Sequence, residues 1–483
     1  MNKIYYIFPL ITLLLSACNA PTSPSQSESE SKDSESVVPS DPRPDEFLET
    51  SLYTETMSPL GDFTPTTFNE SSLSVMEREI LSEGVEFINY TFTLNSGNKV
   101  IASTIEVDLT KADIRTNYSV GASSVLYTQM NDFQNKNQDV TVIAGINADF
   151  FARGGSSVNA YIKDDVVIKS GHNDNGLYDY TNLSADIPAS MPMLLGVDGE
   201  YARIAPIVEN KTVEETIRSK FEYKIKYAGQ DKVVHDLNEG VAYNLPNGVN
   251  KLSANYTFVD TPVNLGVSPS AGDTCYVLEV MEGDYKIKHA VVSEIWACDG
   301  NKVYTDDTVD GYAYFFTKKG FDLDLQEGDF VGVVLGNEDS KFDGYSNVIG
   351  GRQSLVENGK IAPTVKLENS NGAQSTNVPR SAVAIKDDGK LLICAIEALR
   401  YGKKSNSSSD GYGVNLPELA EFLREINCCD ALNFDGGGST SLITKNLVNN
   451  GDYQVKVRSS DYGTYSLTQS RQIYNSLLIT TKK

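Results

Sequence analysis

The sequence predicts a β-rich fold of the α+β (mixed α/β) class, with few helices and a β-rich middle segment. Three observations support this class. After residue 85 the chain consists mostly of short runs rich in β-branched and aromatic residues, separated by Gly, Asn or Asp turns. Residues 416–427 have the clearest helical spacing. That helix stands between two apolar runs, 391–397 and 431–434, which is the order of a β-α-β unit.

Length and charge exclude some classes of protein. The chain has 483 residues, enough for two or three ordinary domains, and a formal net charge of −24. Nucleic-acid binding depends on basic patches that neutralise phosphates, so this charge argues against it. The same charge argues against electrostatic adhesion to an anionic membrane.

The N-terminus has the features of a targeting segment. Lys3 supplies a positive charge, and residues 4–15 form an apolar stretch that is too short to span a bilayer. Residues 15–18 (LSAC) resemble the lipobox of bacterial lipoproteins, which implies a signal peptide over residues 1–17 and lipidation of Cys18. The alternative is an ordinary signal peptide with a stray cysteine. We expect an exported protein that is anchored to the cell membrane by lipid alone and faces outward.

The other cysteines and the histidines give little support to a metal or redox centre. Six cysteines occur, so five remain if Cys18 carries lipid, and an odd number cannot all pair internally. Cys275 and Cys298 fall in neighbouring predicted strands and could form a bridge. No CxxC pair has zinc spacing, and the three histidines lie outside HExxH or GxSxG contexts.

Composition divides the chain after the predicted signal peptide into three parts. Residues 18–45 are rich in Ser and Glu and are predicted to be a disordered tether. Residues 46–84 form an N-terminal extension, in which residues 75–81 have the pattern of a short helix. One domain is expected over residues 85–483, and it includes the β-rich middle segment at about 207–335.

The expected elements of that domain follow from turn and spacing signals. Residues 87–93 and 100–108 form a predicted hairpin, a helix is expected over 124–136, and a buried strand over 140–146. Further turns are expected at residues 163–165, 197–200, 358–359 and 388–389.

The predicted helix over 416–427 connects the apolar runs that precede Glu397 and Asp435. Asn415 is its expected N-cap, and Pro417 lies in its first turn. The carboxyl ends of parallel strands meet at one edge of an α/β sheet, where such folds bind ligands. We therefore expect Glu397 and Asp435 to lie at neighbouring strand ends.

Carboxylates follow three of the predicted apolar strands: Asp149, Glu397 and Asp435. A single carboxylate at a strand end is usually a cap or part of a turn. Three of them, with glycine clusters and with Arg380 and Arg400 nearby, indicate a carboxylate-lined site with anion donors. The three glycines after Asp435 could present their N–H groups to an anion, or they could simply form a tight turn.

This set of residues fits the cleavage of a glycosidic bond. Such chemistry uses two carboxyl groups, one as acid and one as base or nucleophile. A phosphate leaving group needs less help from the acid, and an arginine fork would hold it. Hard oxygen ligands leave open a divalent cation such as calcium, but no EF-hand spacing occurs, so no cofactor and no metal ligand is assigned.

The chain resembles a known family at five segments. They occur in the order seen in phosphodiester glycosidases: residues 147–151 (NADFF), 349–351 (IGG), 379–381 (PRS), 435–440 (DGGGST) and 471–475 (RQIYN). The resemblance covers about residues 85–483. It implies a hydrolase that cleaves the glycosidic bond of a sugar-1-phosphodiester, such as N-acetylglucosamine-1-phosphodiester, at the cell surface.

The matching positions give a set of expected site residues. Asp435 or Asp149 would be base or nucleophile, and Glu397 would be the acid. The expected substrate-binding residues are Asn147, Gly350, Gly351, Arg380, Gly436, Gly437, Gly438, Ser439, Thr440, Arg471 and Asn475.

The chain departs from the family at residues 397–400 (EALR), where the family has Asp-Gly-Arg. This departure leaves an alternative, a non-catalytic glycan-binding surface lipoprotein with the same fold. A structural or adhesive lipoprotein has only the tether in its support.

Overall fold

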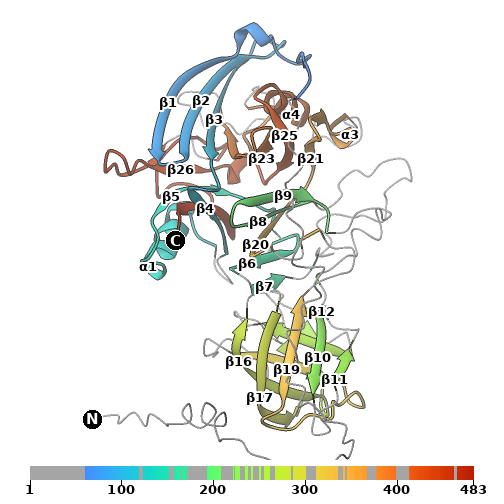
Figure 1. Ribbon diagram of the computed structural model, residues 1–483. Helices are drawn as coiled ribbons and strands as arrows, with labels where there is room; N and C mark the ends of the chain where they lie inside the picture. Colours follow the sequence, from blue (N-terminus) through green and yellow to red (C-terminus); the bar gives the residue numbers. More distant parts are fainter. Residues whose placement is uncertain are drawn as a thin grey trace, which may run out of the picture. The chain divides into compact units, whose positions relative to one another are not determined.

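A computed structural model describes residues 60–118, 123–151, 157–164, 166–169, 171, 193–207, 221, 223–228, 234–237, 241–242, 250–251, 255–260, 267–283, 287–300, 312–335, 341–342, 345–366, 377–398, 413–461 and 465–483. The predicted signal peptide, Cys18, the tether and Arg400 lie outside these residues. Within them the fold is mostly β, with the helices α1 (Leu126–Lys136), α3 (Pro363–Lys366) and α4 (Leu416–Glu425) (Figure 1). None of the helices described is long and apolar enough to cross a membrane.

Sheet A contains eight strands and carries the predicted hairpins. Their order is β1 (Ser74–Ser82), β2 (Val85–Thr93), β3 (Lys99–Val107), β24 (Leu391–Ile396), β23 (Arg380–Lys386), β25 (Cys428–Asn433), β21 (Ser354–Glu357) and β22 (Lys360–Ile361). The hairpin β2–β3 is confirmed. The short helix expected over 75–81 is wrong, because this segment is β1, which pairs antiparallel with β2 across the turn at Gly84. Main-chain pairing in this hairpin prevails over helical spacing.

The predicted β-α-β unit is present in a split form. β23 lies between β24 and β25 and is antiparallel to both, so β24 and β25 run in the same direction. Glu397 and Asp435 therefore follow strands that end at the same edge but are not neighbours, contrary to our expectation. Arg380, the first residue of β23, lies at that edge between them.

Sheet B has five strands and packs against sheet A. Their order is β27 (Tyr453–Val455), β26 (Leu442–Lys445), β5 (Val142–Asn147), β28 (Asn475–Thr481) and β4 (Ala112–Tyr118). Alternate residues of β24 point to opposite faces, as strand geometry requires. Ile393 joins a core cluster with Leu477 of sheet B, whereas Cys394 joins a second cluster with Leu419 of α4. Helix α1, expected over 124–136 and confirmed, packs on the other face of sheet B.

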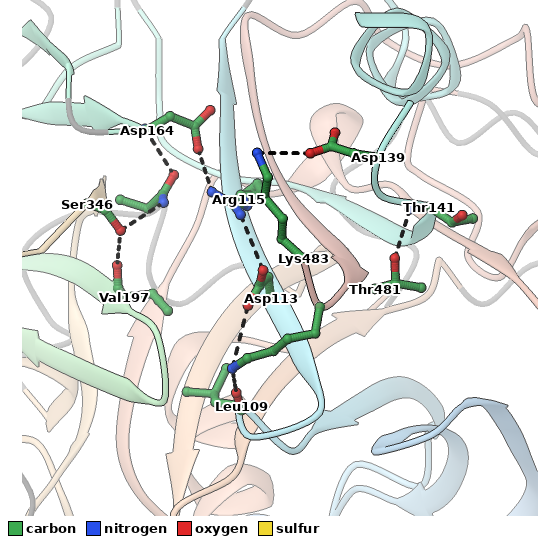
Figure 2. A network of polar contacts seen from close by, with 12 residues as sticks. Leu109, Asp113, Arg115, Asp139, Thr141, Asp164, Val197, Ser346, Thr481 and Lys483 are labelled. Atoms are coloured by element: carbon green, nitrogen blue, oxygen red, sulfur yellow. Dashed lines mark hydrogen bonds and ion pairs between the residues drawn. The ribbon is translucent and has the colours of Figure 1, made fainter. Parts of the chain in front are cut away.

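Polar contacts fasten the outer strand of sheet B (Figure 2). Arg115 in β4 binds Asp113 at 3.2 Å and Asp164 at 3.0 Å, and the C-terminal Lys483 binds Asp139 at 2.9 Å. Ion pairs that remain in contact with water contribute only about 0–1 kcal/mol each. These contacts therefore position the strand ends, while the apolar core supplies most of the stability.

Two further large sheets and one two-stranded sheet complete the described fold. Sheet C has the order β7 (Val166–Lys169), β6 (Tyr161–Lys163), β20 (Asn347–Gly351), β8 (Met193–Asp198) and β9 (Tyr201–Ala205). Sheet D has eight strands in the order β11 (Val234–Leu237), β10 (Tyr223–Ala228), β19 (Phe330–Leu335), β17 (Ile287–Ala297), β16 (Thr274–Gly283), β18 (Tyr312–Thr317), β14 (Tyr256–Asp260) and β12 (Val241–Ala242). The strands β13 (Asn250–Lys251) and β15 (Val267–Ser268) form a separate two-stranded sheet. The middle segment is thus β-rich wherever it is described. Cys275 and Cys298 lie buried in one cluster there, and their bridge stays a prediction.

The middle of the predicted N-terminal extension is bound to α4. Glu421 accepts hydrogen bonds from the backbone N–H and the hydroxyl of both Thr66 and Thr67, at 2.6–2.8 Å. Arg424 donates to the carbonyl of Gly61 at 2.7 Å. Phe68 is buried against Phe92, with ring centroids 4.7 Å apart. Residues 61–68 are therefore packed against the domain predicted to begin at residue 85, although the domain boundaries themselves stay predictions.

The N-cap of α4 gives a first prediction. Asn415 accepts the Glu418 N–H at 2.8 Å, and the Glu418 carboxylate accepts the Asn415 N–H at 2.9 Å. Asn415→Ala removes the first bond and is expected to lower the free energy of unfolding by about 1 kcal/mol. Urea unfolding should show a lower midpoint. Asn449→Ala, at an exposed position where only the backbone N–H is bonded, should leave the midpoint unchanged. An unchanged midpoint in Asn415→Ala would contradict the cap.

Candidate active site

The Asp-Gly-Gly-Gly segment is the connection between the two packed sheets. β25 of sheet A ends at Asn433, and β26 of sheet B begins at Leu442. Gly437 has φ +63°, a left-handed conformation that favours glycine. A Cβ on Gly438 would lie 2.1 Å from Nη2 of Arg471, so only glycine lets this arginine come so close. Gly437 and Gly438 therefore allow the chain to turn tightly from β25 to β26 close to the side chain of Arg471.

Asn147, the last residue of β5, joins the ends of both sheets. Its Nδ2 donates to the carbonyl of Asp435 at 2.6 Å. Its Oδ1 accepts from the Ser441 N–H at 3.0 Å and from the Ser381 hydroxyl at 2.7 Å. The Asp435 N–H in turn donates to the carbonyl of Ala148 at 2.9 Å. These bonds bring Asp149 and Asp435 together from different sheets.

Asp149 is enclosed, being 1% exposed. It accepts hydrogen bonds from the Ser157 hydroxyl, from the Asn159 N–H at 2.9 Å and from Asn159 Nδ2 at 2.8 Å. Burial raises the pKa of Asp149, and these donors act in the opposite direction. Ser157 and Asn159 were not predicted, because no motif in the sequence marks them.

Gly350 and Gly351 act on Asp149 through Asn159. A Cβ on Gly350 would lie 2.2 Å from the Cβ of Asn159, and a Cβ on Gly351 would lie 2.6 Å from Cγ of Leu432. The carbonyl of Gly351 accepts Asn159 Nδ2 at 2.8 Å. The glycine pair thus allows β20 to approach both Asn159 and β25.

Asp435 is half-buried, and its pKa is raised to about 6, chiefly by burial. The Ser439 hydroxyl, the positive charge of Arg471 and the Gly436 N–H lower this pKa, whereas the charge of Asp149 raises it. Of the two aspartates, Asp435 is the one with access to solvent. It is therefore the better candidate of the two for contact with a substrate.

Two arginines act on Asp435. Arg380 is buried and donates from Nε to the carbonyl of Val414 at 3.2 Å. Burial lowers its pKa to about 10, so it remains charged at neutral pH. Arg471 pairs with Asp461 at 2.7 Å and reaches the Ser439 hydroxyl at 3.4 Å. Asp461 was not predicted, since it carries no motif.

Two of the three glycine amides of the expected anion nest have partners within the protein, and the nest itself stays a prediction. The Gly437 N–H donates to the carbonyl of Pro379 at 2.7 Å, and the Gly436 N–H bonds to the Asp435 carboxylate. The loop needs these bonds to hold its turn against β23. These two amides are therefore used within the protein itself.

Glu397 lies apart from this group of contacts. It is 1% exposed, and its Oε1 accepts from Nε of Arg458 at 2.6 Å and from the hydroxyl of Tyr465. The guanidinium of Arg458 lies 5.2 Å from the centroid of the Tyr465 ring. The arginine partner of this carboxylate thus comes from residue 458, which the sequence patterns did not indicate.

Several buried polar groups beside Asn147 lack partners. Among the described residues, no hydrogen bond is found for the side-chain amide of Asn475, the hydroxyl of Thr440 or the hydroxyl of Ser441. Asn475 begins β28, whose next residue pairs with Asn147. A buried polar group without a partner costs about 1–3 kcal/mol. This cost is relieved if a polar ligand or water binds these groups.

No cluster of three or more His, Cys, Asp or Glu side chains suited to a metal ion occurs in the part of the chain that the structure describes. The divalent cation left open by the sequence is therefore given no ligands.

Comparison with known proteins supports the predicted class. Residues 296–480 match the sequence model of the phosphodiester glycosidase family, which confirms the resemblance for this part of the chain. This region contains Arg380, Asp435 and Arg471 but not Asn147 or Asp149. A search of curated proteins finds no match.

Several solved structures are similar, including the three that follow. A hypothetical protein from Synechocystis has a TM-score of 0.52 and 16% identity over 85% of this chain; the match spans 64% of that protein's length, and it shows a shared fold. A protein from Burkholderia pseudomallei described as exported has a TM-score of 0.46 and 12% identity, covering 88% of this chain and 99% of its own. The catalytic domain of zebrafish N-acetylglucosamine-1-phosphodiester α-N-acetylglucosaminidase, auto-inhibited by its pro-peptide, has a TM-score of 0.37 and 12% identity, covering 86% of this chain and 89% of its own.

The raised pKa of Asp435 predicts a pH-dependent stability. A carboxyl pKa of about 6 lies above the ordinary value of 3.8, so the protonated form stabilises the fold below about pH 4 and this contribution is lost as pH rises through 6. Asp435→Asn should therefore raise the free energy of unfolding at pH 8. Since the side chain keeps contact with solvent, we expect about 1–2 kcal/mol rather than the full amount for two pKa units.

Urea unfolding at pH 8 and at pH 3.5 measures this effect, and the difference from the unmodified protein should vanish at the lower pH. Asp452→Asn, which removes an exposed carboxylate, controls for the change in net charge. A destabilised Asp435→Asn protein at pH 8 would show that the ionised carboxylate supports the fold.

Proposed function

We propose that the protein is a hydrolase that cleaves the glycosidic bond of a sugar-1-phosphodiester, such as N-acetylglucosamine-1-phosphodiester. The observation that carries the proposal is the setting of Asp435. Asp435 is the more exposed of the two aspartates and has a raised pKa. It is under the influence of both Arg380 and Arg471, in the region that matches the phosphodiester glycosidase family.

Asp435 is the base in this proposal. Its carboxylate takes a proton from water, the water oxygen bonds to C1 of the sugar, and the C1–O bond to phosphate breaks. The electron pair leaves on the phosphate oxygen, which gives a free sugar and a phosphomonoester. This leaving group is already stabilised as an anion, and arginine adds charge-assisted hydrogen bonds, so a strong general acid is not required.

Asp149 and Glu397 have supporting roles. Asp149 is closed off by three donors and acts on Asp435 through its charge. Glu397 is held by Arg458 and Tyr465, and this arrangement favours a structural role over that of the acid. The unpartnered groups of Asn475, Thr440 and Ser441 are suited to sugar hydroxyls.

The test is sugar release from uridine diphosphate N-acetylglucosamine and from methyl-phospho-N-acetylglucosamine. We expect turnover by the purified protein, with kcat/KM rising as pH increases through about 6 because Asp435 has to be ionised. Asp435→Asn should lower kcat by about 10³-fold with folding intact. Asp452→Asn should leave it unchanged.

The outcomes separate the two candidate functions. Equal turnover by Asp435→Asn would exclude the assigned base. Absence of release from a folded protein that still binds these compounds would favour the glycan-binding lipoprotein, whose motivation is the altered segment around Glu397. The same assay with a chelator tests the divalent cation.

We also propose that the protein works at the cell surface, anchored by lipid on Cys18. The support is the sequence of residues 1–18 alone. Cys18→Ala should move the protein from the membrane fraction to the soluble fraction. Cys394→Ala, at a buried core position, should not. A Cys18→Ala protein that stays with the membrane would contradict the anchor.

A further inference from the structure

Lys169, the last residue of β7, is a buried lysine without a part in the proposed reaction. Its side chain is 2% exposed. Its Nζ donates to the carbonyls of Ser157 at 2.5 Å and Val158 at 2.7 Å. Lysine is almost never buried unless it is paired, so this position requires a reason.

The two carbonyls belong to the segment that holds Asp149. Within three consecutive residues, Ser157 and Asn159 supply all three hydrogen bonds to the Asp149 carboxylate, while Ser157 and Val158 bind Lys169. The ammonium group therefore fixes the backbone that sets the position of these donors. The Gly351 carbonyl holds the same segment from β20, through Asn159.

Charge links the same groups. Burial lowers the pKa of Lys169 and raises that of Asp149, and the opposite charges of the two act against both shifts. Asp149 also influences Asp435, Tyr118 of β4 and Tyr161 of β6. Burial raises the pKa of both tyrosines, so they stay neutral over the working range. Lys169 is thus the cation that acts on Asp149, whereas Arg380 and Arg471 act on Asp435.

We propose that Lys169 is a positioning residue for this site: it holds residues 157–159 against Asp149 and supplies the positive charge that keeps this carboxylate ionised. An ionised Asp149 then raises the proton affinity of Asp435. The kinetic consequence rests on the proposed function, but the effect on the two carboxylates does not.

The inference predicts opposite shifts in two pKa values. Without the charge of Lys169, Asp149 should bind its proton more tightly, and its pKa should rise. Asp435 then loses the repulsion of a neighbouring anion, and its pKa should fall by about one unit. A merely structural lysine would not move two carboxylates in opposite directions.

The experiment is a carboxyl-carbon NMR titration of the full protein labelled at aspartate, with Asp149→Asn and Asp435→Asn used to assign the signals. Lys169→Gln retains a donor but removes the charge, and it should show both shifts. Lys169→Arg, which retains the charge, should restore the original values. Lys163→Met, a partly buried lysine in the adjoining strand β6, is the matched control and should change neither pKa.

Unchanged carboxylates in a folded Lys169→Gln protein overturn the proposal. If this variant fails to fold, the test uses the unmodified protein, in which the NMR signal of the Lys169 ε-carbon reports whether the amine is charged. A neutral Lys169 amine at a pH where Asp149 is already a carboxylate overturns the proposal, and an ammonium there supports it. Kinetics distinguish a failure of this inference from a failure of the proposed function. If Lys169→Gln loses turnover but the pKa values of Asp149 and Asp435 do not change, the role of Lys169 is contradicted. If both pKa values change but the unmodified protein has no turnover, only the proposed glycosidase activity is contradicted.

Discussion

The site depends on one side-chain amide, that of Asn147. It joins the end of β5 to the carbonyl of Asp435, to the amide of Ser441 and to the hydroxyl of Ser381 in β23. Sheets A and B pack through apolar side chains, and such packing alone leaves the ends of strands loosely placed. The buried amide of Asn147 fixes these positions, because moving it away would leave each of its partners without a hydrogen bond. Strand ends from two sheets are thereby held in one place.

Carboxylates and cations lie close to Asn147. Two carboxylates, Asp149 and Asp435, are brought together, and each has a raised pKa because water is largely excluded. Three cations on separate elements interact electrostatically with these carboxylates: Lys169 of β7, Arg380 of β23 and Arg471, which precedes β28. Such an arrangement contributes little to the stability of the fold. Perturbed groups of this kind are a feature of functional sites, which agrees with the family match.

Local signals predicted much of the fold and part of the site. Turn residues gave the hairpin β2–β3, and the cap at Asn415 gave the start of α4. Residues 75–81 were misjudged because their pairing with β2 outweighs helical spacing. The position of Asp435 after an apolar strand was visible, whereas Asn159, Lys169 and Arg458 became evident only in three dimensions. No motif marks them. Arg458 meets Glu397 across 61 positions, and Asn159 reaches Gly351 across 192 positions, whereas Lys169 binds residues only 11 and 12 positions away through contacts that turn and spacing signals do not show.

The same long-range construction has a consequence for how the protein forms. Sheet A unites β1–β3 with β21–β25, and sheet B unites β4 and β5 with β26–β28. Thr66 and Glu421, which bond to each other, are 355 positions apart. Folds of such high contact order form slowly, because distant segments have to meet before either is stabilised. During synthesis β5 emerges long before its partner strand β28, so a nascent chain that stops short of β28 holds both aspartates but lacks Asn475 and the strand that pairs with β5.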